Sequence, residues 1–305
     1  MTVHVEAAPV RRWRVSRNGL QGWAFAAPTA AFVIGLFLIP IFIVVQMSAS
    51  DWPLFTGRQG TNFPDNYRAV LDNRFFWPSI VFTIKYTVVT TVILIALGLG
   101  LALLVQESTR WKGVLRTVIL VPSALGLASA SLLFYALYSP QSGPISPMLE
   151  KLGLIDEPIS FLGTPNAALF STVFLIVWRF TGFYMLLLLV GLQGINADIY
   201  ESAEIDGASR WQSFRHITLP LLRPTLALCT IMCVTGSLLA FDQFYILTKG
   251  GPDNSTITVV QLIYGVAFQG ANDLGIAGAL SILVLIALLI LNVAMFRRLR
   301  SPEEN

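Results

Sequence analysis

Charge is the property that this chain has least of. Only 12% of its 305 residues are charged, whereas 55% are hydrophobic. A soluble domain carries about a quarter charged residues and about half apolar ones. Because folded soluble proteins of this size still expose a large surface to water, one core cannot hide so many apolar side chains. The composition excludes an ordinary soluble domain and indicates a protein whose solvent is the lipid bilayer.

Cysteine and histidine are also scarce, which removes several kinds of chemistry. Cys229 and Cys233 are the only cysteines and lie four residues apart in an apolar stretch, where helical geometry does not suit a disulfide. We interpret them as small core residues rather than a metal pair. The only histidines, His4 and His216, are too few for a metal cluster. The sequence also lacks the G-x-x-x-x-G-K-[ST] loop that cradles ATP phosphates, so we expect a non-catalytic chain that binds no metal or cofactor itself.

Six segments are long and apolar enough to cross a bilayer, for which about 20 residues suffice. Barrel strands would be short and alternating, so we predict helices. The predicted fold class is an all-α membrane protein with six transmembrane helices in one domain at 23–297, between tails at 1–22 and 298–305. The predicted spans are Phe25–Met47, Ser79–Val105, Val114–Tyr138, Ala168–Leu192, Leu222–Leu247 and Leu274–Phe296.

The first span superficially resembles a signal peptide, because Arg11, Arg12, Arg14 and Arg17 precede it and small residues follow it. The apolar part of a signal peptide has only about 7–15 residues. The run at 23–47 is far longer and can cross the bilayer. We therefore expect a first span that is retained.

The positions of lysine and arginine predict the orientation. Thirteen of the 20 lie in the two tails and in the second and fourth connections, and five lie in the other three connections. Basic residues are enriched on the cytoplasmic side, so both termini are expected there. The basic residues form no stripe, which gives no reason to expect nucleic-acid binding. The thirteen are Arg11, Arg12, Arg14, Arg17, Arg110, Lys112, Arg116, Arg210, Arg215, Arg223, Arg297, Arg298 and Arg300, and the five are Arg58, Arg68, Arg74, Lys151 and Lys249.

The longest connection on the predicted cytoplasmic side is 193–221, between the fourth and fifth spans. Asp198 is expected to cap a short helix that ends near Asp206. Gly207 then allows a turn with positive φ, and a second short helix is expected from Ser209. Such an amphipathic helix–turn–helix suits either insertion into a groove on a partner protein or a position on lipid headgroups. Composition alone does not decide between them.

The same connection carries a family resemblance. Glu201-Ser202-Ala203, then Gly207, then Ile217-Thr218-Leu219-Pro220, resembles the E-A-A–x3–G–x9–I–x–L–P signature of bacterial ABC importer permeases, with Ser202 replacing the middle alanine. The resemblance implies a type I importer permease fold whose coupling helix, between helices 4 and 5, docks into a cleft of a cytoplasmic ATPase. It implies that Glu201 faces a basic group on that ATPase. The implied coupling residues are Glu201, Ser202, Ala203, Asp206, Gly207, Ile217, Leu219 and Pro220.

Further segments resemble the carbohydrate-uptake, maltose-type branch, and the last resembles its first-permease type. They are Asn66-Tyr67-Arg68-Ala69-Val70-Leu71, Arg116-Thr117-Val118-Ile119-Leu120-Val121-Pro122, Gly191-Leu192-Gln193, and 241–248 followed by Gly250-Gly251-Pro252. The resemblance implies a multi-pass bacterial inner-membrane subunit that imports a sugar together with a homologous second permease. It also implies two ATPase subunits, which use ATP and Mg²⁺, and an extracytoplasmic solute-binding protein. Importers of polyols and glycerol phosphate share this signature and remain an alternative.

Polar residues inside the spans indicate where a solute would pass. Arg179 lies near the middle of the fourth span, where a charge costs at least a few kcal/mol, so it is expected to face water or the bundle interior. It either lines a translocation cavity or pairs with Asp242 of the fifth span. Asp242 equally suits an acidic helix end near the outer interface, but hydrogen-bonding groups beside aromatic faces are typical of sugar sites. The candidate substrate-path residues are Trp178, Arg179, Phe183, Asp242, Gln243 and Tyr245.

Two other function classes were weighed against an importer subunit. A self-sufficient secondary transporter usually has inverted repeats and paired Gly/Pro interruptions at mid-membrane, and no such pairing is apparent. A membrane-embedded enzyme would need a nucleophile–base or metal constellation, and the sequence offers none.

Overall fold

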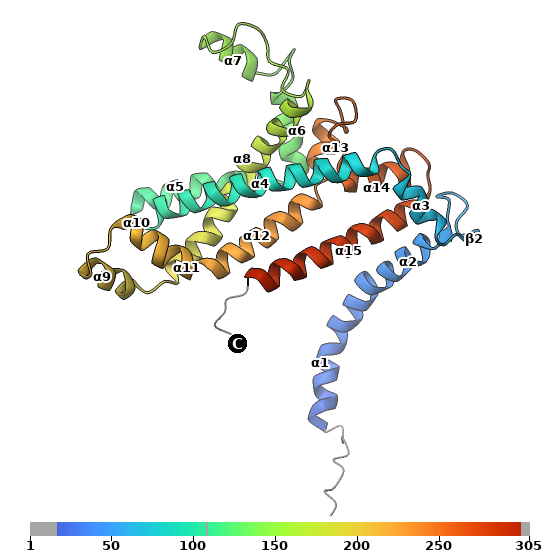
Figure 1. Cartoon of the computed structure of the whole chain (residues 1–305), viewed down its shortest axis with the longest axis horizontal. Helices are drawn as coiled ribbons and strands as arrows, with labels where there is room; N and C mark the ends of the chain where they lie inside the picture. Colours follow the sequence, from blue (N-terminus) through green and yellow to red (C-terminus); the bar gives the residue numbers. More distant parts are fainter. Residues whose placement is uncertain (1–16, 108, 300–305) are drawn as a thin grey trace, which may run out of the picture.

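The computed structural model describes residues 17–107 and 109–299 and is almost entirely helical (Figure 1). Within this part of the chain, five helices are long and apolar enough to cross a membrane, and a bent helix pair makes a sixth if it counts as one span. The elements before the bend are α1 (Arg17–Val33), the π segment η1 (Ile34–Leu38), α2 (Ile39–Ser48), β1 (Ser50–Asp51), β2 (Gly60–Thr61), α3 (Asp65–Leu71), α4 (Phe76–Val105), α5 (Arg110–Leu120) and the 3-10 segment η2 (Val121–Ala124).

The elements after the bend run from the second half of the third span to the C-terminal helix. They are α6 (Leu127–Leu137), α7 (Ile145–Lys151), α8 (Pro165–Gln193), α9 (Ala197–Ile205), α10 (Arg210–Ser213), the π segment η3 (Phe214–Thr218), α11 (Leu219–Leu221), α12 (Arg223–Leu238), α13 (Asp242–Leu247), α14 (Val259–Phe268) and α15 (Leu274–Leu299).

The main core lies where α4 packs against α8 and α12. Its largest fully buried side chains include Tyr86 and Leu94 of α4, Leu188 of α8 and Phe244 of α13. Gly98 of α4 allows the close approach of α8, because a Cβ at this position would lie 3.2 Å from the Tyr184 Cβ and 3.3 Å from the Met185 backbone nitrogen. Small residues at such crossings let helices in lipid gain packing contacts that the hydrophobic effect does not provide there.

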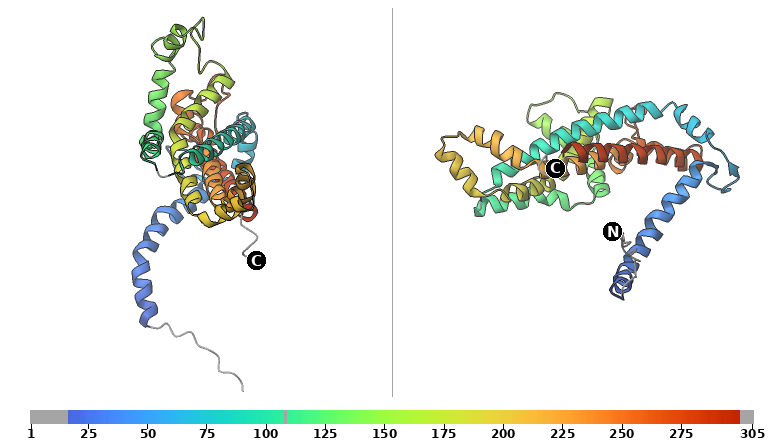
Figure 2. Two further views of the ribbon diagram at one scale, coloured as in Figure 1. Left: turned by 90° about the vertical axis from the view of Figure 1, so that its left-hand side faces the viewer. Right: turned by 60° about the horizontal axis from the view of Figure 1, so that its bottom comes forward.

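The first span diverges from the rest of the molecule. None of its most apolar 18-residue stretch is buried, and α1 and α2 leave the body in all three views (Figures 1 and 2). Only the end of α2 is anchored: the Asn66 side-chain amide donates to the backbone oxygens of Ser48, at 3.1 Å, and Ser50, at 2.8 Å. The first span is therefore an apolar arm (α1, η1 and α2) whose length is uncovered in this chain.

Both π segments precede a proline by two residues. η1 ends at Leu38 before Pro40, and η3 ends at Thr218 before Pro220. A proline inside a helix has no N–H, and its ring clashes with the carbonyl four residues earlier. Widening the preceding turn to a π turn accommodates the ring, so the helix continues through the proline.

The predicted third span, Val114–Tyr138, is not one straight helix. α5 and η2 form one arm and α6 the other, and the two meet at 93°. Pro122 cannot donate a helical hydrogen bond, the chain tightens into η2, and Leu125 and Gly126 take extended backbone angles (φ −71°, ψ 139° and φ −61°, ψ 145°). We call this break at Leu125–Gly126 the elbow.

Helices occupy the other five predicted ranges. α4 begins three residues before the predicted second span and ends at the same residue, and α8 extends beyond both predicted ends of the fourth. The fifth is interrupted between Leu238 and Asp242. α1 begins at Arg17, inside the range predicted as a tail, and α15 continues through Leu299. Arg11, Arg12, Arg14, Arg300 and most of both predicted tails lie outside the described residues.

Candidate functional site

The connection from 193 to 221 forms the predicted helix–turn–helix at one end of the molecule (Figure 1). Its N-cap differs from the prediction: the Asn196 side chain, not that of Asp198, accepts a hydrogen bond from a backbone N–H at the start of α9, at 3.1 Å. Asp198 lies two residues after this cap, in the first turn of α9. There its negative charge interacts favourably with the positive end of the helix dipole. The α9 helix ends at Ile205, one residue before Asp206.

The turn and second helix have the predicted form. Gly207 has a φ of +76°, a conformation that L side chains rarely adopt. Ser209 then caps α10 in a reciprocal capping box with Gln212. The rings of Trp211 and Phe214 lie with centroids 5.5 Å apart. We call the unit from Asn196 to Leu221 the α9–α10 loop.

The α9–α10 loop presents acidic and apolar side chains together. Ile205 is 86% exposed and Trp211 is 66% exposed, and the carboxylates of Glu201 and Asp206 are exposed as well. A cleft of about 290 Å³ lies at the turn and along α10 and η3, and it is lined by residues that include Asp206, Gly207 and Gln212. The other predicted coupling residues differ in their exposure. Ser202 and Leu219 are exposed, whereas Ala203, Ile217 and Pro220 are half-buried.

One tie within this loop was not predicted from the sequence. The Tyr200 hydroxyl and the buried Thr218 hydroxyl lie 2.9 Å apart, which joins α9 to η3. A hydroxyl pair 18 residues apart gives no recognisable spacing signal. This hydrogen bond connects α9 to η3, the segment that leads into α12.

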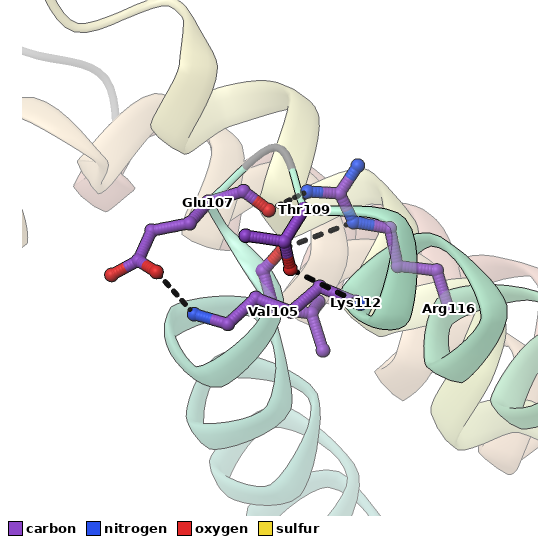
Figure 3. Close-up of polar contacts among 5 residues, drawn as sticks. All are labelled: Val105, Glu107, Thr109, Lys112 and Arg116. Carbon is purple, nitrogen blue, oxygen red and sulfur yellow. Dashed lines mark hydrogen bonds and ion pairs between the residues drawn. The ribbon is translucent and has the colours of Figure 1, made fainter.

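A second turn at the same end connects α4 to α5 (Figure 3). Arg116 reaches back and donates through Nε to the Val105 carbonyl at 3.0 Å and through its Nη2 to the Glu107 carbonyl at 3.1 Å, so it caps the end of α4. Glu107 also pairs with the Lys112 ammonium at 2.7 Å. The Lys112 hydrogen bond and charge hold the pKa of Glu107 below its usual range.

A cavity of about 370 Å³ lies among α4, α6, α8, α12 and α13. Of the predicted substrate-path residues, Phe183, Asp242 and Gln243 line it, whereas Trp178, Arg179 and Tyr245 do not. Aromatic and hydroxyl-bearing side chains line part of the wall, and aliphatic ones line most of the rest. The aromatic and hydroxyl-bearing residues not predicted from the sequence include Tyr86, Phe180, Tyr184, Ser237 and Phe241.

Gln243 connects two walls of this cavity. Its side chain is only 2% exposed and donates through Nε2 to the Tyr86 hydroxyl at 3.1 Å. Its Oε1 has no hydrogen-bond partner among the described residues, so one strong acceptor is left unused beside the cavity. Buried side-chain oxygens usually accept a hydrogen bond. Because Gln243 lines the cavity, its Oε1 can accept one from a polar ligand.

Arg179 occupies neither of the two positions expected from the sequence. Among the residues that the structure describes, it forms no ion pair with Asp242. Its Nε donates to the Leu125 carbonyl at 2.8 Å, and its guanidinium lies 4.1 Å from the centre of the Phe180 ring. Trp178 packs against Phe134 with ring centroids 5.2 Å apart.

Tyr245 belongs to a group of aromatic rings beside the cavity. It stacks on Phe241 and meets the edge of Tyr264, with ring centroids 5.1 and 5.3 Å apart, respectively. Its hydroxyl accepts a hydrogen bond from Gln269 at 3.1 Å. The predicted aromatic surface therefore exists, but Tyr245 stands behind Phe241 rather than in the cavity wall.

One of the unpredicted cavity residues, Tyr86, belongs to a pattern that the sequence does show. Ser79, Thr83, Tyr86 and Thr90 recur on α4 at intervals of three or four residues, and all four are buried. This spacing places them on one helix face. The face points inward, although the surrounding residues are apolar on every side of the helix.

The chain matches known transport proteins over most of its length. Residues 94–301 match the family model described as "Binding-protein-dependent transport system inner membrane component". The trehalose/maltose transport system permease of Thermococcus litoralis is 36% identical over 86% of this chain and 92% of its own length. The lactose transport system permease of Rhizobium radiobacter is 32% identical over 93% of this chain and 95% of its own length.

The fold is also found in solved structures. A bacterial ABC transporter involved in the import of the acidic polysaccharide alginate contains a chain with a TM-score of 0.80 at 24% identity, covering 93% of this chain and 96% of that one. The alginate transporter in complex with a pentasaccharide-bound periplasmic protein gives a TM-score of 0.82 at 22% identity, covering 95% and 98%, respectively. At these identities the likeness establishes the fold.

Proposed function

Because this chain belongs to the family of binding-protein-dependent transport system inner membrane components, we propose that it forms part of the translocation path of an ATP-driven sugar importer. The observation that carries the proposal is the connection between the α9–α10 loop and the cavity. α8 enters the loop and α12 leaves it, and both helices line the cavity. A force on the loop therefore acts on two cavity walls.

The surface of the α9–α10 loop suits a protein partner better than lipid headgroups. Exposed carboxylates at Glu201, Glu204 and Asp206 would be repelled by anionic headgroups, whereas interfacial helices are rich in lysine and arginine. The exposed side chains of Ile205 and Trp211 would provide apolar anchors. We propose that this loop docks on an ATPase subunit, with Glu201 facing a basic group and with ATP and Mg²⁺ bound by the ATPase.

The cavity chemistry favours an uncharged sugar. Aromatic faces and hydrogen-bonding groups line it, and Asp242 is its one acidic side chain, with no lysine or arginine among the lining residues. Pyranose rings bind to such aromatic faces and donors, whereas a phosphate would need cations. Two relatives are described as permeases for trehalose/maltose and for lactose, which supports a neutral sugar over glycerol phosphate.

The uncovered first arm favours a second permease as partner. Most of its apolar side chains are exposed, although Val44 and Met47 near its end are half-buried against α15, so a neighbouring membrane protein can add packing along the rest of the arm. We propose a complex of this chain, a homologous second permease, two ATPase subunits and an extracytoplasmic binding protein. In this arrangement the α9–α10 loop and both termini are cytoplasmic.

The turn at Gly207 provides a direct test. Replacing it with proline requires a φ near −65°, far from the observed +76°, so the loop cannot keep its shape. We expect Gly207→Pro to abolish sugar uptake and the stimulation of ATP hydrolysis by the loaded binding protein. Gly207→Asn is the matched control, because asparagine tolerates positive φ, and we expect it to retain most of both activities.

The measurement is made on the complete complex in lipid vesicles, with ATP hydrolysis and labelled-sugar uptake followed together. Normal uptake by Gly207→Pro would refute the docking role. A panel of sugars, polyols and glycerol phosphate, each presented on the binding protein, identifies the solute class in the same assay.

A further inference from the structure

The elbow leaves a backbone carbonyl without a helical partner. Leu125 lies between η2 and α6 in an extended conformation, and the next helix begins at Leu127. A carbonyl that is freed within a membrane span needs another donor wherever lipid replaces water. Arg179 of α8 supplies it through Nε at 2.8 Å.

A second hydrogen bond runs in the opposite direction between the same two segments. The Ser123 hydroxyl donates to the backbone carbonyl of Arg179 at 2.7 Å. One bond reaches the elbow itself, at Leu125, and the other reaches Ser123, two residues before it. We call this pair of bonds the elbow clasp.

The neighbouring turn of α8 holds the chain on the N-terminal side of the elbow. A Cβ on Gly182 would lie 2.3 Å from the Ile119 carbonyl oxygen and 2.8 Å from the Leu120 Cα, so α5 and α8 are in backbone contact there. α5 is thus fixed against α8 independently of the clasp. α6, beyond the elbow, packs against α13, and at its far end the Tyr138 hydroxyl donates to the Ser171 carbonyl of α8 at 2.9 Å. The start of α6, at Leu127, lies next to the elbow clasp.

The clasp also connects to the cavity. Leu127, the first residue of α6, lines the cavity, and so does Phe180, whose ring lies against the Arg179 guanidinium. Arg179 itself is not among the lining residues. Arg179 therefore contacts a residue of the cavity wall, Phe180, without lining the cavity itself.

We propose that Arg179 is a positioning residue for transport: it holds the elbow so that the start of α6, with Leu127, keeps its place in the cavity wall. The effect of Arg179 on transport rests on the proposed function, whereas its effect on the elbow does not. The clasp itself concerns the shape of the cavity and can be measured without any solute.

The measurement uses a cysteine at Leu127 as a reporter, in a chain whose Cys229 and Cys233 are replaced by alanine. The assembled complex in lipid vesicles reacts with a small, membrane-impermeant thiol reagent without sugar or nucleotide. Arg179→Met removes one bond of the clasp, and Ser123→Ala removes the other without changing any charge. Lys85→Met is the matched control, because it deletes another charge inside a span, one bonded to Asn166, away from the elbow.

We expect Arg179→Met to raise the labelling rate by about tenfold, since a hydrogen bond from a charged donor is among the stronger ones. Ser123→Ala should raise it several-fold, and Arg179→Lys, which keeps one donor, should fall between wild type and Arg179→Met. In sugar-uptake assays, the KM for sugar should rise in the same order of variants as the labelling rate. The rate of ATP hydrolysis per complex should stay at the wild-type value. Lys85→Met should leave the labelling rate unchanged.

Two results would overturn the proposal. If Arg179→Met raises KM but the labelling rate stays at the wild-type value, Arg179 acts on the solute directly. If Ser123→Ala labels at the wild-type rate, the clasp does not hold the elbow, and this variant decides the question even if Arg179→Met fails to assemble. Failure of the wild-type complex to transport any sugar would refute the proposed function, whereas the solute-free labelling would still report on the clasp.

Discussion

The bond between Gln243 and Tyr86 allows a quantitative test of the cavity. Both side chains are buried, and the Gln243 Nε2 donates to the Tyr86 hydroxyl at 3.1 Å. Replacing Gln243 with methionine keeps the volume but leaves the buried hydroxyl without this donor, which costs about 1–3 kcal/mol. Replacing Tyr86 with phenylalanine strands the amide in the same way.

The double variant separates the bond from the packing. When both polar groups are removed, no stranded partner remains, so the loss should be smaller than the sum of the two single losses. Hydrogen bonds between membrane helices contribute about 0.6 kcal/mol on average, with a maximum near about 1.7 kcal/mol, and we expect a coupling energy in this range. The assay is denaturant unfolding of the complex in mixed micelles, with ΔG of unfolding obtained for the four proteins of the cycle.

Transport kinetics provide the second half of this test. Gln243→Met removes the unused Oε1 beside the cavity, whereas Tyr86→Phe keeps that oxygen in place. We therefore expect a higher KM for sugar in Gln243→Met than in Tyr86→Phe at similar stability. Additive stabilities together with equal KM values would show that the pair neither ties the two walls nor meets the solute.

Three further substitutions test the contacts around the cavity and the loop. Gly182→Ala places a Cβ against the Ile119 carbonyl and should lower stability by about 1–3 kcal/mol, measured as a fall in the thermal midpoint of the complex. Arg116→Met leaves the Val105 and Glu107 carbonyls without their donor and should cost about 1–3 kcal/mol, visible as faster hydrogen exchange at the end of α4. Tyr200→Phe removes the bond to Thr218 and should weaken the stimulation of ATP hydrolysis by the binding protein while basal hydrolysis persists.

Span positions could be predicted from the sequence because they depend on apolar length, a property of the chain itself. The elbow could not. Pro122 was visible, but a proline in a membrane helix gives either a kink or a complete break, according to which neighbours satisfy the freed carbonyls. Here the donor to Leu125 is Arg179, more than 50 residues away along the chain. Only the tertiary structure brings the two together.

The predicted site divides in the same way. The turn at Gly207 and a second helix from Ser209 follow from local conformational preferences, which do not depend on the rest of the fold, and the structure confirms both. The predicted cap at Asp198 is wrong, because Asn196 caps α9. Arg179 and Tyr245 were assigned to the cavity by composition, and neither lines it. Packing determines which face of an apolar helix points inward. When a helix is apolar on all sides, its sequence shows no periodicity from which that face could be predicted.

The one feature that joins the α9–α10 loop, the cavity and the elbow is α8. It is a single uninterrupted helix of 29 residues, whereas the third and fifth spans are broken at the elbow and at Leu239–Phe241. From Arg179 to the end of α8 at Gln193 is about 21 Å at 1.5 Å per residue. A continuous helix transmits a displacement over that length with little bending, since every turn is held by backbone hydrogen bonds. A displacement that the α9–α10 loop passes to α8 would therefore be carried along this helix to the clasp and the elbow.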